Sequence, residues 1–478
     1  MPPSPDKPWF PPQLGKYETE LAHEDFNNRQ KAPEVEVEVN TVYDLPELID
    51  IAERANPQTR IAWEHARQAA AAVGLSKSAY FPYLVASAGA GYERAFLPFP
   101  TLKQGPGTDV KITGGGTLTA DAAAENATLG LKWLLFDFGA RKAASTMAKE
   151  NLMMANVGFN AVHQLIVFTV TRRFYELNTA RQKVEVAESS VRAADTVAKS
   201  AQARFDNGLG TKPELLQAEQ QFAQAAFELE AARGELSDAQ VALVESLGIL
   251  PTTKLQVAEV SEKPFSEYSG DTLEELIQRA LSQRPDLVAK LADVRARQAE
   301  VQKARAAYYP QISLSANGGW AELDVSAKNS SYFGGNGPYY GAKISVEMPL
   351  FDGFARREKL HTAESELRAA KDELTHSRDS VIREVWKART DFETALRKQE
   401  SAAKLVVAAE NAFAASLEAY QNGLGTYVDV ANAQRNVTAS RSVVVDTRSA
   451  IFTSQAALAL SIGDLARPSP PTTMIHQR

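Results

Sequence analysis

The sequence contains no cysteine among its 478 residues. This absence excludes disulfide bonds, thiol nucleophiles and thiolate metal ligands. It is also compatible with an oxidising compartment, where unpaired thiols are a liability. No stretch approaches 18 consecutive apolar residues, so we expect no transmembrane helix.

Positive charge is not in excess either. The chain has 52 Lys and Arg against 59 Asp and Glu, a net charge of −7, so we expect no nucleic-acid partner. No phosphate-binding loop is present, and the histidines are not spaced as metal-ligand pairs on a helix. We therefore expect no enzyme activity, no metal and no cofactor. The histidines are His23, His65, His163, His361, His376 and His476.

The two ends of the chain are rich in proline. Residues 1–42 predict an extended N-terminal arm, and residues 466–478 predict a C-terminal tail. The first residues lack the basic and apolar segments of a secretory signal. We expect a mature form that carries an added Met, the alternative being a cytoplasmic protein.

Residues 141–205 are predicted to form one long helix. Large or branched residues recur every seven positions there, with alanine three residues later, as in a coiled-coil seam. The first set is Leu177, Val184, Val191, Ala198 and Phe205; the second is Ala180, Ala187, Ala194 and Ala201. A second copy covers 356–420. Roughly 65 residues make a rod of about 100 Å, which predicts packing against neighbouring helices or, alternatively, a two-stranded coiled coil.

The chain is an internal duplication. Leu45, Leu48 and Ile49 recur 228 residues later, and Asn56-Pro57 recurs as Arg284-Pro285. We therefore predict a first repeat at 43–250, a linker at 251–270 and a second repeat at 271–465. Asp44 and Glu47 predict a capped helix at the start of the first repeat.

Each repeat also contains two strands of about ten residues, in which apolar and small polar residues alternate. Polar loops are expected at 105–126 and 324–337. Strands of this length can cross an outer membrane in a tilted barrel. Packing on a soluble core is the alternative, but two matching hairpins that each lead into a long helix favour the membrane. Aromatic residues near the strand ends predict a membrane-interface belt: Tyr92, Trp133, Trp320, Tyr339 and Tyr340.

Both long helices are followed by a Gly-Leu-Gly-Thr turn. Glycine supplies the positive φ of a helix end, and threonine can cap the return helix. The turns are Gly208, Leu209, Gly210 and Thr211 in the first repeat, and Gly423, Leu424, Gly425 and Thr426 in the second.

The predicted fold is mainly α with a small β part. Four strands in one chain cannot close, and an open edge leaves unpaired backbone groups in lipid. Closure therefore needs several copies, eight strands in a dimer or twelve in a trimer.

This arrangement resembles the TolC-type outer membrane efflux protein family over about residues 41–463. The resemblance is carried by the helix starts at Asn56-Pro57 and Arg284-Pro285, by the strand boundaries and by the paired turns. Those strand boundaries are Tyr80-Phe81-Pro82, Tyr308-Tyr309-Pro310, Leu135-Phe136-Asp137 and Leu350-Phe351-Asp352. The resemblance implies a homotrimer, with a 12-stranded transmembrane barrel in outer-membrane lipid and long antiparallel helices forming a periplasmic α-barrel.

It further implies that the turns contact a periplasmic adaptor protein, which links to an inner-membrane pump. Many relatives carry a lipid-bearing Cys, which this sequence lacks.

The resemblance also implies candidate pore residues at the start of the last return helix. Asp429 matches an acidic position that rings the periplasmic opening, and Asn432 replaces a second acid. Three Asp429 side chains would attract cations, the alternative being a solvated acid in a first helical turn. Glu214 is the equivalent in the first repeat.

Tyr420 and Tyr427 flank the turn and are candidates to narrow the opening. Packing in the helix seam is the alternative for Tyr420. We expect the opening to be closed at rest. The predicted function is the passive exit duct of a tripartite efflux system for small molecules. The alternatives are the exit channel of a type I protein secretion system and a soluble coiled-coil scaffold.

Overall fold

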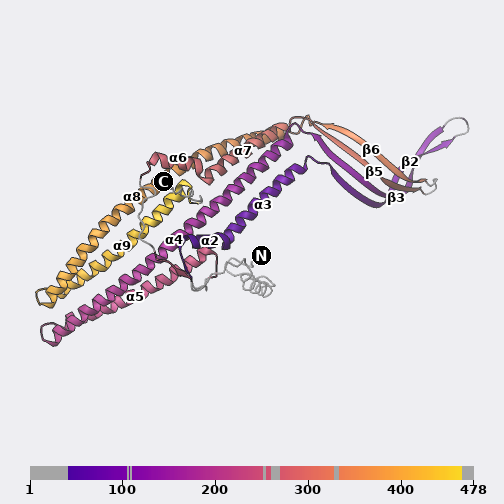
Figure 1. The fold of residues 1–478 in the computed structure, drawn as a ribbon. Helices are drawn as coiled ribbons and strands as arrows, with labels where there is room; N and C mark the ends of the chain where they lie inside the picture. Colours follow the sequence, from indigo (N-terminus) through magenta and orange to yellow (C-terminus); the bar gives the residue numbers. More distant parts are fainter. Residues whose placement is uncertain are drawn as a thin grey trace. The chain divides into compact units, whose positions relative to one another are not determined.

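The computed structural model describes residues 41–104, 107, 110–250, 255–259, 270–327 and 333–465. Nearly all of the predicted N-terminal arm, most of the linker and the C-terminal tail lie outside these residues. Figure 1 shows two helical hairpins and a sheet. The helices are α2 (Leu45–Ala55), α3 (Pro57–Ser78), α4 (Ala140–Asp206), α5 (Lys212–Leu247), α6 (Leu273–Gln283), α7 (Pro285–Ala306), α8 (Ala355–Gln421) and α9 (Tyr427–Ile462).

The chain divides into two compact units. The first comprises Met1–Ala66, Ala155–Ala289 and Thr375–Arg478, and the second comprises Arg67–Met154 and Lys290–Leu374. Each unit draws on both halves of the sequence. The division into two sequence repeats stays a prediction.

The two predicted long helices are confirmed to within one residue at each end, since α4 and α8 have 67 residues each. Four members of the predicted seam are buried, namely Leu177, Ala180, Ala194 and Ala201. Phe205, the last seam position, is exposed, and Val197 is buried next to the seam position Ala198, which is half-buried. The seam therefore shifts on the helix surface near the turn.

Helix starts follow the predicted capping chemistry. Asp44 accepts a hydrogen bond from Glu47 N at 3.0 Å, and the Glu47 carboxylate accepts one from Asp44 N at 2.9 Å. The same reciprocal pair joins Thr272 and Glu275 at α6. Each pair satisfies two backbone donors that a helix start leaves free.

The return helix α5 ends against the start of α3. Gly248 has φ of 75°, and a Cβ there would stand 2.7 Å from Asn56 Cα. Asn56 Nδ2 donates to Ser246 O at 3.1 Å. The second repeat repeats this contact, with Gly463 against Arg284. The glycines thus permit both a left-handed backbone and a close approach.

The first unit has matching apolar clusters in the two repeats. One contains Leu48, Leu177 and Leu247, and the other contains Leu276 and Ile462 among its buried members. In each cluster a short helix, a long helix and a return helix meet. Burial of these side chains fixes the short helices against the long ones.

The second unit contains an antiparallel sheet in the order β2-β3-β5-β6. The strands are Tyr83–Gln104, Val110–Phe136, Gln311–Ala327 and Phe333–Glu347, with 22, 27, 17 and 15 residues. The predicted length of about ten residues is therefore wrong, and the strands run through most of the expected loops. Those segments are rich in Gly, Ala and Thr, so backbone pairing defines them rather than alternating hydrophobicity.

A short parallel pair was not predicted. β1 (Val42–Tyr43) pairs with β4 (Gln256–Val257), and Arg181 Nη1 donates to Val257 O at 2.7 Å. Two residues per strand give no periodic pattern, so only the folded chain brings these segments together.

The junctions from strand to long helix share one design. Asp137 accepts a hydrogen bond from Arg141 N at 2.7 Å and pairs with its guanidinium, which lies 4.7 Å from the ring centre of Tyr80. Asp352 and Arg356 form the same pair in the second repeat. The acid caps the helix and the arginine fixes it to the preceding segment.

One helix of the described residues, α4, is long and apolar enough to cross a membrane by length and composition. No such helix is expected from the sequence, because no stretch approaches 18 consecutive apolar residues. This criterion is weak for a single helix, because a core helix of a soluble protein also meets it. Of the apolar stretch of α4, 28% is buried.

Candidate functional site

The turn that follows α4 has the geometry of a Schellman motif. Leu209 N donates to Arg204 O at 2.8 Å, and Gly208 N donates to Phe205 O at 3.0 Å. Gly208 has φ of 67°. A Cβ at Gly210 would come within 3.2 Å of Phe205 N. The positive φ at Gly208 and the tight approach at Gly210 both favour glycine in this turn.

The turn that follows α8 repeats this arrangement. Leu424 N donates to Ala419 O at 2.8 Å, and Gly423 N donates to Tyr420 O at 3.1 Å. Gly423 has φ of 77°, and a Cβ at Gly425 would lie 3.2 Å from Ala419 Cβ. The equivalence of the two turns in sequence is thus an equivalence in backbone geometry.

Both turns expose a leucine. In a Schellman motif the residue after the glycine commonly packs on the last turn of its helix. Leu209 is instead 71% exposed and Leu424 is 86% exposed. An uncovered apolar side chain at the same place in both turns offers a contact surface for a partner. The remaining predicted contact residues, Thr211 and Thr426, cap the return helices.

Asp429 and Glu214 each close the first turn of a return helix. The Asp429 carboxylate accepts hydrogen bonds from Thr426 Oγ1 at 2.6 Å and from Thr426 N at 3.2 Å. These two bonds hold the pKa of Asp429 below its usual range, and the bond from the Thr426 hydroxyl has the larger effect. Glu214 accepts one from Thr211 N at 3.1 Å. Asp429 is exposed, so it presents its charge while it caps; its place in a pore ring stays a prediction.

Asn432 lies three residues after Asp429, and its Oδ1 accepts a hydrogen bond from Arg435 Nη2. This neighbour was missed in the sequence. The available signal in the sequence was the spacing of three residues between Asn432 and Arg435, which places their side chains on one helix face. The expected uncharged second position therefore has a guanidinium beside it.

Tyr420 and Tyr427 lie in an apolar cluster between the two turns. Tyr420 is 1% exposed, and the two ring centroids are 6.4 Å apart. Tyr427 OH donates to Gln217 O at 2.9 Å. Burial raises the pKa of both phenols. Within this chain both side chains therefore pack between helices. The other members are Val197, Ala201, Leu215, Ala218, Val430 and Ala431.

Arg204 connects the two turns and was also missed. Its guanidinium carbon lies 4.8 Å from the ring centre of Tyr420, and Nη1 donates to Tyr420 O at 2.8 Å. Nη2 donates to Leu209 O at 3.2 Å. A basic residue in the last turn of a helix was the available signal, but its contact with the second hairpin depends on the fold.

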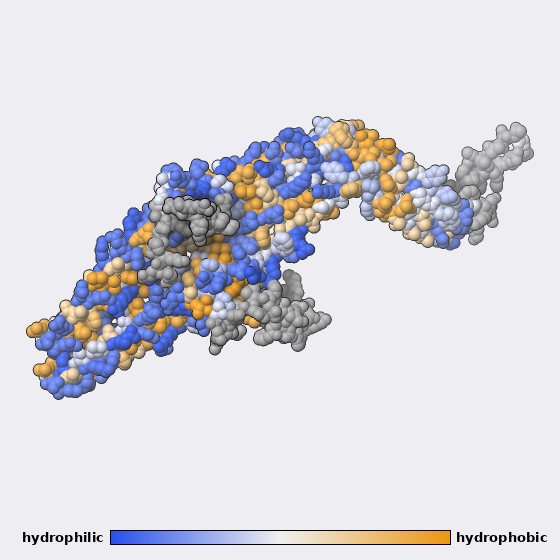
Figure 2. Space-filling view, in the orientation of Figure 1, coloured by the Kyte–Doolittle hydropathy of each residue, from blue (hydrophilic) through white to orange (hydrophobic). Residues whose placement is uncertain are grey.

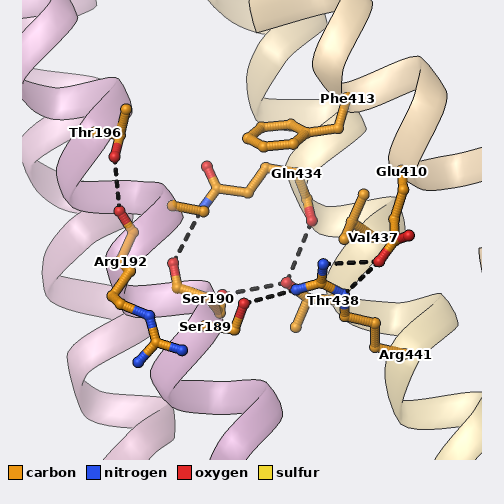
Figure 3. Close-up of a pocket in the computed structure, with 11 residues that line it drawn as sticks. Ser189, Ser190, Arg192, Thr196, Glu410, Phe413, Gln434, Val437, Thr438 and Arg441 are labelled. Carbon is orange, nitrogen blue, oxygen red and sulfur yellow. Dashed lines mark hydrogen bonds and ion pairs between the residues drawn. The ribbon is translucent and has the colours of Figure 1, made fainter.

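A polar hollow of about 490 Å³ lies between α4, α8 and α9 (Figure 3). Arg441 donates to Glu410 at 2.7 Å and to Ser189 Oγ at 2.6 Å. Gln434 donates from Nε2 to Ser190 O at 3.3 Å, and its buried Oε1 has no protein partner among the described residues. A polar hollow of this size can hold water. The contact between the three helices is therefore polar here, and the side chains do not fill the space between them.

The two faces of the sheet differ in chemistry. Figure 2 shows apolar side chains over the part of the sheet nearest the helices, and more polar residues toward its far end. The apolar face includes Leu84, Leu129, Leu131, Ile344 and Val346, and the polar face includes Ser87, Asn126, Thr128, Lys343 and Ser345. An exposed apolar face suits lipid, and a polar face suits a water-filled lumen.

Four of the five predicted belt aromatics lie on the apolar face, namely Tyr92, Trp133, Trp320 and Tyr340. Tyr340 is 93% exposed. Their contact with membrane stays a prediction.

Tyr339 lies on the polar face instead. It is the cross-strand partner of Gly319, and its hydroxyl lies 2.5 Å from Thr128 Oγ1. Tyr339 and Tyr340 therefore lie on opposite faces, because one step along a strand changes the face; the belt position of Tyr339 stays a prediction.

Among the described residues, no group of three or more His, Asp or Glu side chains is arranged to hold a metal ion.

The pattern of the outer membrane efflux protein family matches residues 48–249 and 276–464. Protein CyaE of Bordetella pertussis is 29% identical over 424 residues, covering 88% of this chain and 84% of CyaE. Outer membrane efflux protein BepC of Brucella suis is 23% identical over 372 residues, covering 77% of this chain and 74% of BepC.

Among solved structures, the outer membrane protein VceC from Vibrio cholerae has a TM-score of 0.71 at 20% identity. The match covers 88% of this chain and 96% of VceC, and it shows a shared fold. The efflux family consists of outer-membrane channels with helices in the periplasm, and these channels are not enzymes. Because the family pattern spans most of both halves, the chain belongs to the outer membrane efflux protein family.

Proposed function

We propose that three copies of this chain form a continuous duct, with a 12-stranded barrel in the outer membrane and an α-barrel in the periplasm. The sheet has four strands, with β2 and β6 at its edges. These edges must pair with something in lipid, and pairing β2 of one copy with β6 of the next closes a ring. The two repeats, 43–250 and 271–465, each contribute one hairpin of strands and one of helices.

The helices support the same head-to-tail association. Within one chain α9 packs against the first helical hairpin, as the stacked rings of Tyr175 and Phe452 at 4.4 Å illustrate. Large apolar side chains on α5 and α8 remain exposed, including Phe227 at 70% and Trp386 at 60%. A neighbouring copy would cover these residues and so complete the α-barrel.

The assembly is tested by the mass of the purified protein in detergent. One chain has a mass of 52.0 kDa, so a trimer gives 156 kDa after subtraction of bound detergent. A monomeric or dimeric mass under conditions that preserve folding would contradict the proposal.

The duct serves as the passive exit of a tripartite efflux system for small molecules. The observation that carries this proposal is the pair of exposed leucines, Leu209 and Leu424, on two turns of identical geometry. They suit a periplasmic adaptor protein, through which an inner-membrane pump delivers its cargo. Asp429 and Glu214 lie at the start of the return helices, where acidic side chains would favour cations at the opening.

The test is the accumulation of ethidium in cells that lack the gene. Faster accumulation, reversed by the wild-type gene but not by a variant with serine at both leucines, would support an efflux duct that needs its turns. Unchanged accumulation across a panel of chemically different dyes would contradict small-molecule efflux.

The second candidate function is the exit channel for a secreted protein. One feature of the sheet favours a secreted protein as the cargo: glycine and small side chains dominate the polar face and leave room for a wide bore. A secreted polypeptide that disappears from the culture medium of the deletion strain, while dye accumulation stays normal, would select this alternative.

A further inference from the structure

We propose that Tyr339 sets the width of the duct within the outer membrane, by lying along the barrel wall in a tether to Thr128. This inference rests on the proposed trimeric duct, whose lumen is lined by the polar face of the sheet. It assigns a size-selecting role to a residue that the sequence suggested for the lipid side.

The tether spans three strands. Tyr339 on β6 is paired with Gly319 on β5, and Gly319 is paired with Thr128 on β3. The Tyr339 hydroxyl nevertheless lies 2.5 Å from Thr128 Oγ1. Adjacent strands are about 4.8 Å apart, so the hydroxyl reaches the strand beyond its neighbour. The aromatic ring must therefore cross β5 at Gly319.

Gly319 makes this crossing possible. A Cβ there would stand 2.2 Å from Ala127 O and 3.0 Å from Thr128 Cα, so the backbone tolerates glycine alone. With no side chain beneath it, the ring of Tyr339 can lie on the strand. Its exposure of 36%, against 93% for Tyr340, agrees with a ring held against the wall.

Tyr339 is the one large side chain at its level of the described polar face. The other positions within two residues of that level carry glycine, alanine, serine, threonine or asparagine, except Val85 on β2, the cross-strand partner of Gly130. They are Ser87, Gly89, Asn126, Thr128, Gly130, Asn317, Gly319, Ala321, Gly337 and Gly341.

The orientation of the phenol therefore controls the bore. While its hydroxyl is bonded to Thr128, the Tyr339 ring lies along the barrel wall. Released, it can adopt the ordinary direction of a strand side chain, roughly perpendicular to the sheet, which is into the lumen. Three copies at one level around the axis would then obstruct bulky cargo, while small solutes would still pass.

The absence of cysteine allows a direct test by labelling. Lys343 lies exposed on the polar face, four residues from Tyr339 toward α8. We would introduce Lys343→Cys and label intact cells from outside with membrane-impermeant maleimides, one small and one carrying a bulky polymer. The hydrogen bond of the tether is removed by Thr128→Val or by Tyr339→Phe. If one of these variants misfolds, the other still tests the proposal.

We expect both tether variants to slow the bulky reagent by roughly threefold to tenfold, the bias that one hydrogen bond gives to a two-state equilibrium. Labelling by the small reagent should not change. Tyr339→Ala should restore labelling by the bulky reagent. As a matched control, Ser313→Ala removes another cross-strand hydroxyl pair, 2.9 Å from Ser345 on the same face, and should change neither rate.

Two failures are distinguishable. Equal rates with the bulky reagent in all variants would overturn the role of Tyr339 and leave the duct intact. No labelling of Lys343→Cys even by the small reagent, in a protein that forms normal oligomers on a gel, would contradict the proposed lumen itself.

Discussion

Arg204 in α4 holds Tyr420 in α8 by its ring and by its backbone together. The guanidinium lies 4.8 Å from the ring centre, and Nη1 donates to Tyr420 O at 2.8 Å. This carbonyl belongs to the last turn of α8 and also accepts the hydrogen bond from Gly423 N at 3.1 Å. A Cβ at Gly423 would lie 3.5 Å from Nη1, an ordinary contact distance, so glycine is favoured there by its φ of 77°. One side chain thus links the two helical hairpins beside their turns.

Removing this link should loosen the turns. We expect Arg204→Ala to cost about 1–3 kcal/mol of local packing, the range for a charge-assisted hydrogen bond with a cation–π contact. Single-channel conductance of the purified protein in a planar bilayer should rise. Arg192→Ala, an exposed arginine on the same helix, is the control. Equal conductance for wild type and Arg204→Ala would show that this link does not restrict the opening.

Gly234 lies within α5 and Gly248 lies directly after it, so the two glycines can be compared. Gly248→Ala should destabilise the fold by more than about 1 kcal/mol, because its φ is 75° and the new Cβ would meet Asn56. At Gly234 a Cβ meets nothing within 4 Å, so alanine should stabilise the helix by about 0.5–1 kcal/mol. Thermal unfolding in detergent measures both. The same sign for both variants would refute this reading of Gly248.

The charge of Asp429 should set ion selectivity. Asp429→Asn is expected to reduce the preference for cations, measured as the reversal potential under a salt gradient. Asp238→Asn, an exposed acid elsewhere on a return helix, should leave it unchanged. Loss of selectivity in both variants would point to the overall field of the protein rather than to a ring.

The pH dependence of this selectivity follows from the capping hydrogen bonds. The pKa of Asp429 is lowered in the folded protein, below an unfolded value of about 3.9. Its contribution to stability is therefore complete above that unfolded value and is lost as the pH falls through the lower folded value. Cation selectivity should persist at pH 5 and disappear only in stronger acid. Titration of selectivity between pH 5 and 7 would contradict Asp429 as its source.

The exposed leucines should matter for export and not for folding. Leu209→Ser with Leu424→Ser should raise dye accumulation toward that of the deletion strain, while oligomer content and melting temperature stay within the small range of surface substitutions. Leu→Met at both positions keeps apolar contact area and should retain export. Normal export by the serine variant would remove the leucines from the partner surface.

The helical part of the fold could be predicted from sequence because its signals are local. Gly208, Gly248 and Pro57 mark helix ends through backbone geometry, and seven-residue spacing marks the seam between them. These features act within a few residues, so α4 and α8 matched their predicted limits to one residue.

The rest could not be predicted because it depends on contacts distant in sequence. The outer parts of β3 lack alternating hydrophobicity, and β1 pairs with β4 over two residues. Arg204 finds Tyr420 only in the folded chain. Tyr339 shows the sensitivity of a strand, since a one-residue difference separates it from Tyr340 and moves it to the opposite face.

The duplication also has an evolutionary consequence at one glycine. Gly319 and Gly91 occupy equivalent positions 228 residues apart, yet a Cβ at Gly319 collides with the backbone of Ala127, whereas a Cβ at Gly91 meets nothing within 4 Å. Gly319 is paired with Tyr339, whereas Gly91 lies on the edge strand β2. The first position therefore admits glycine alone, while the second has room for a larger residue.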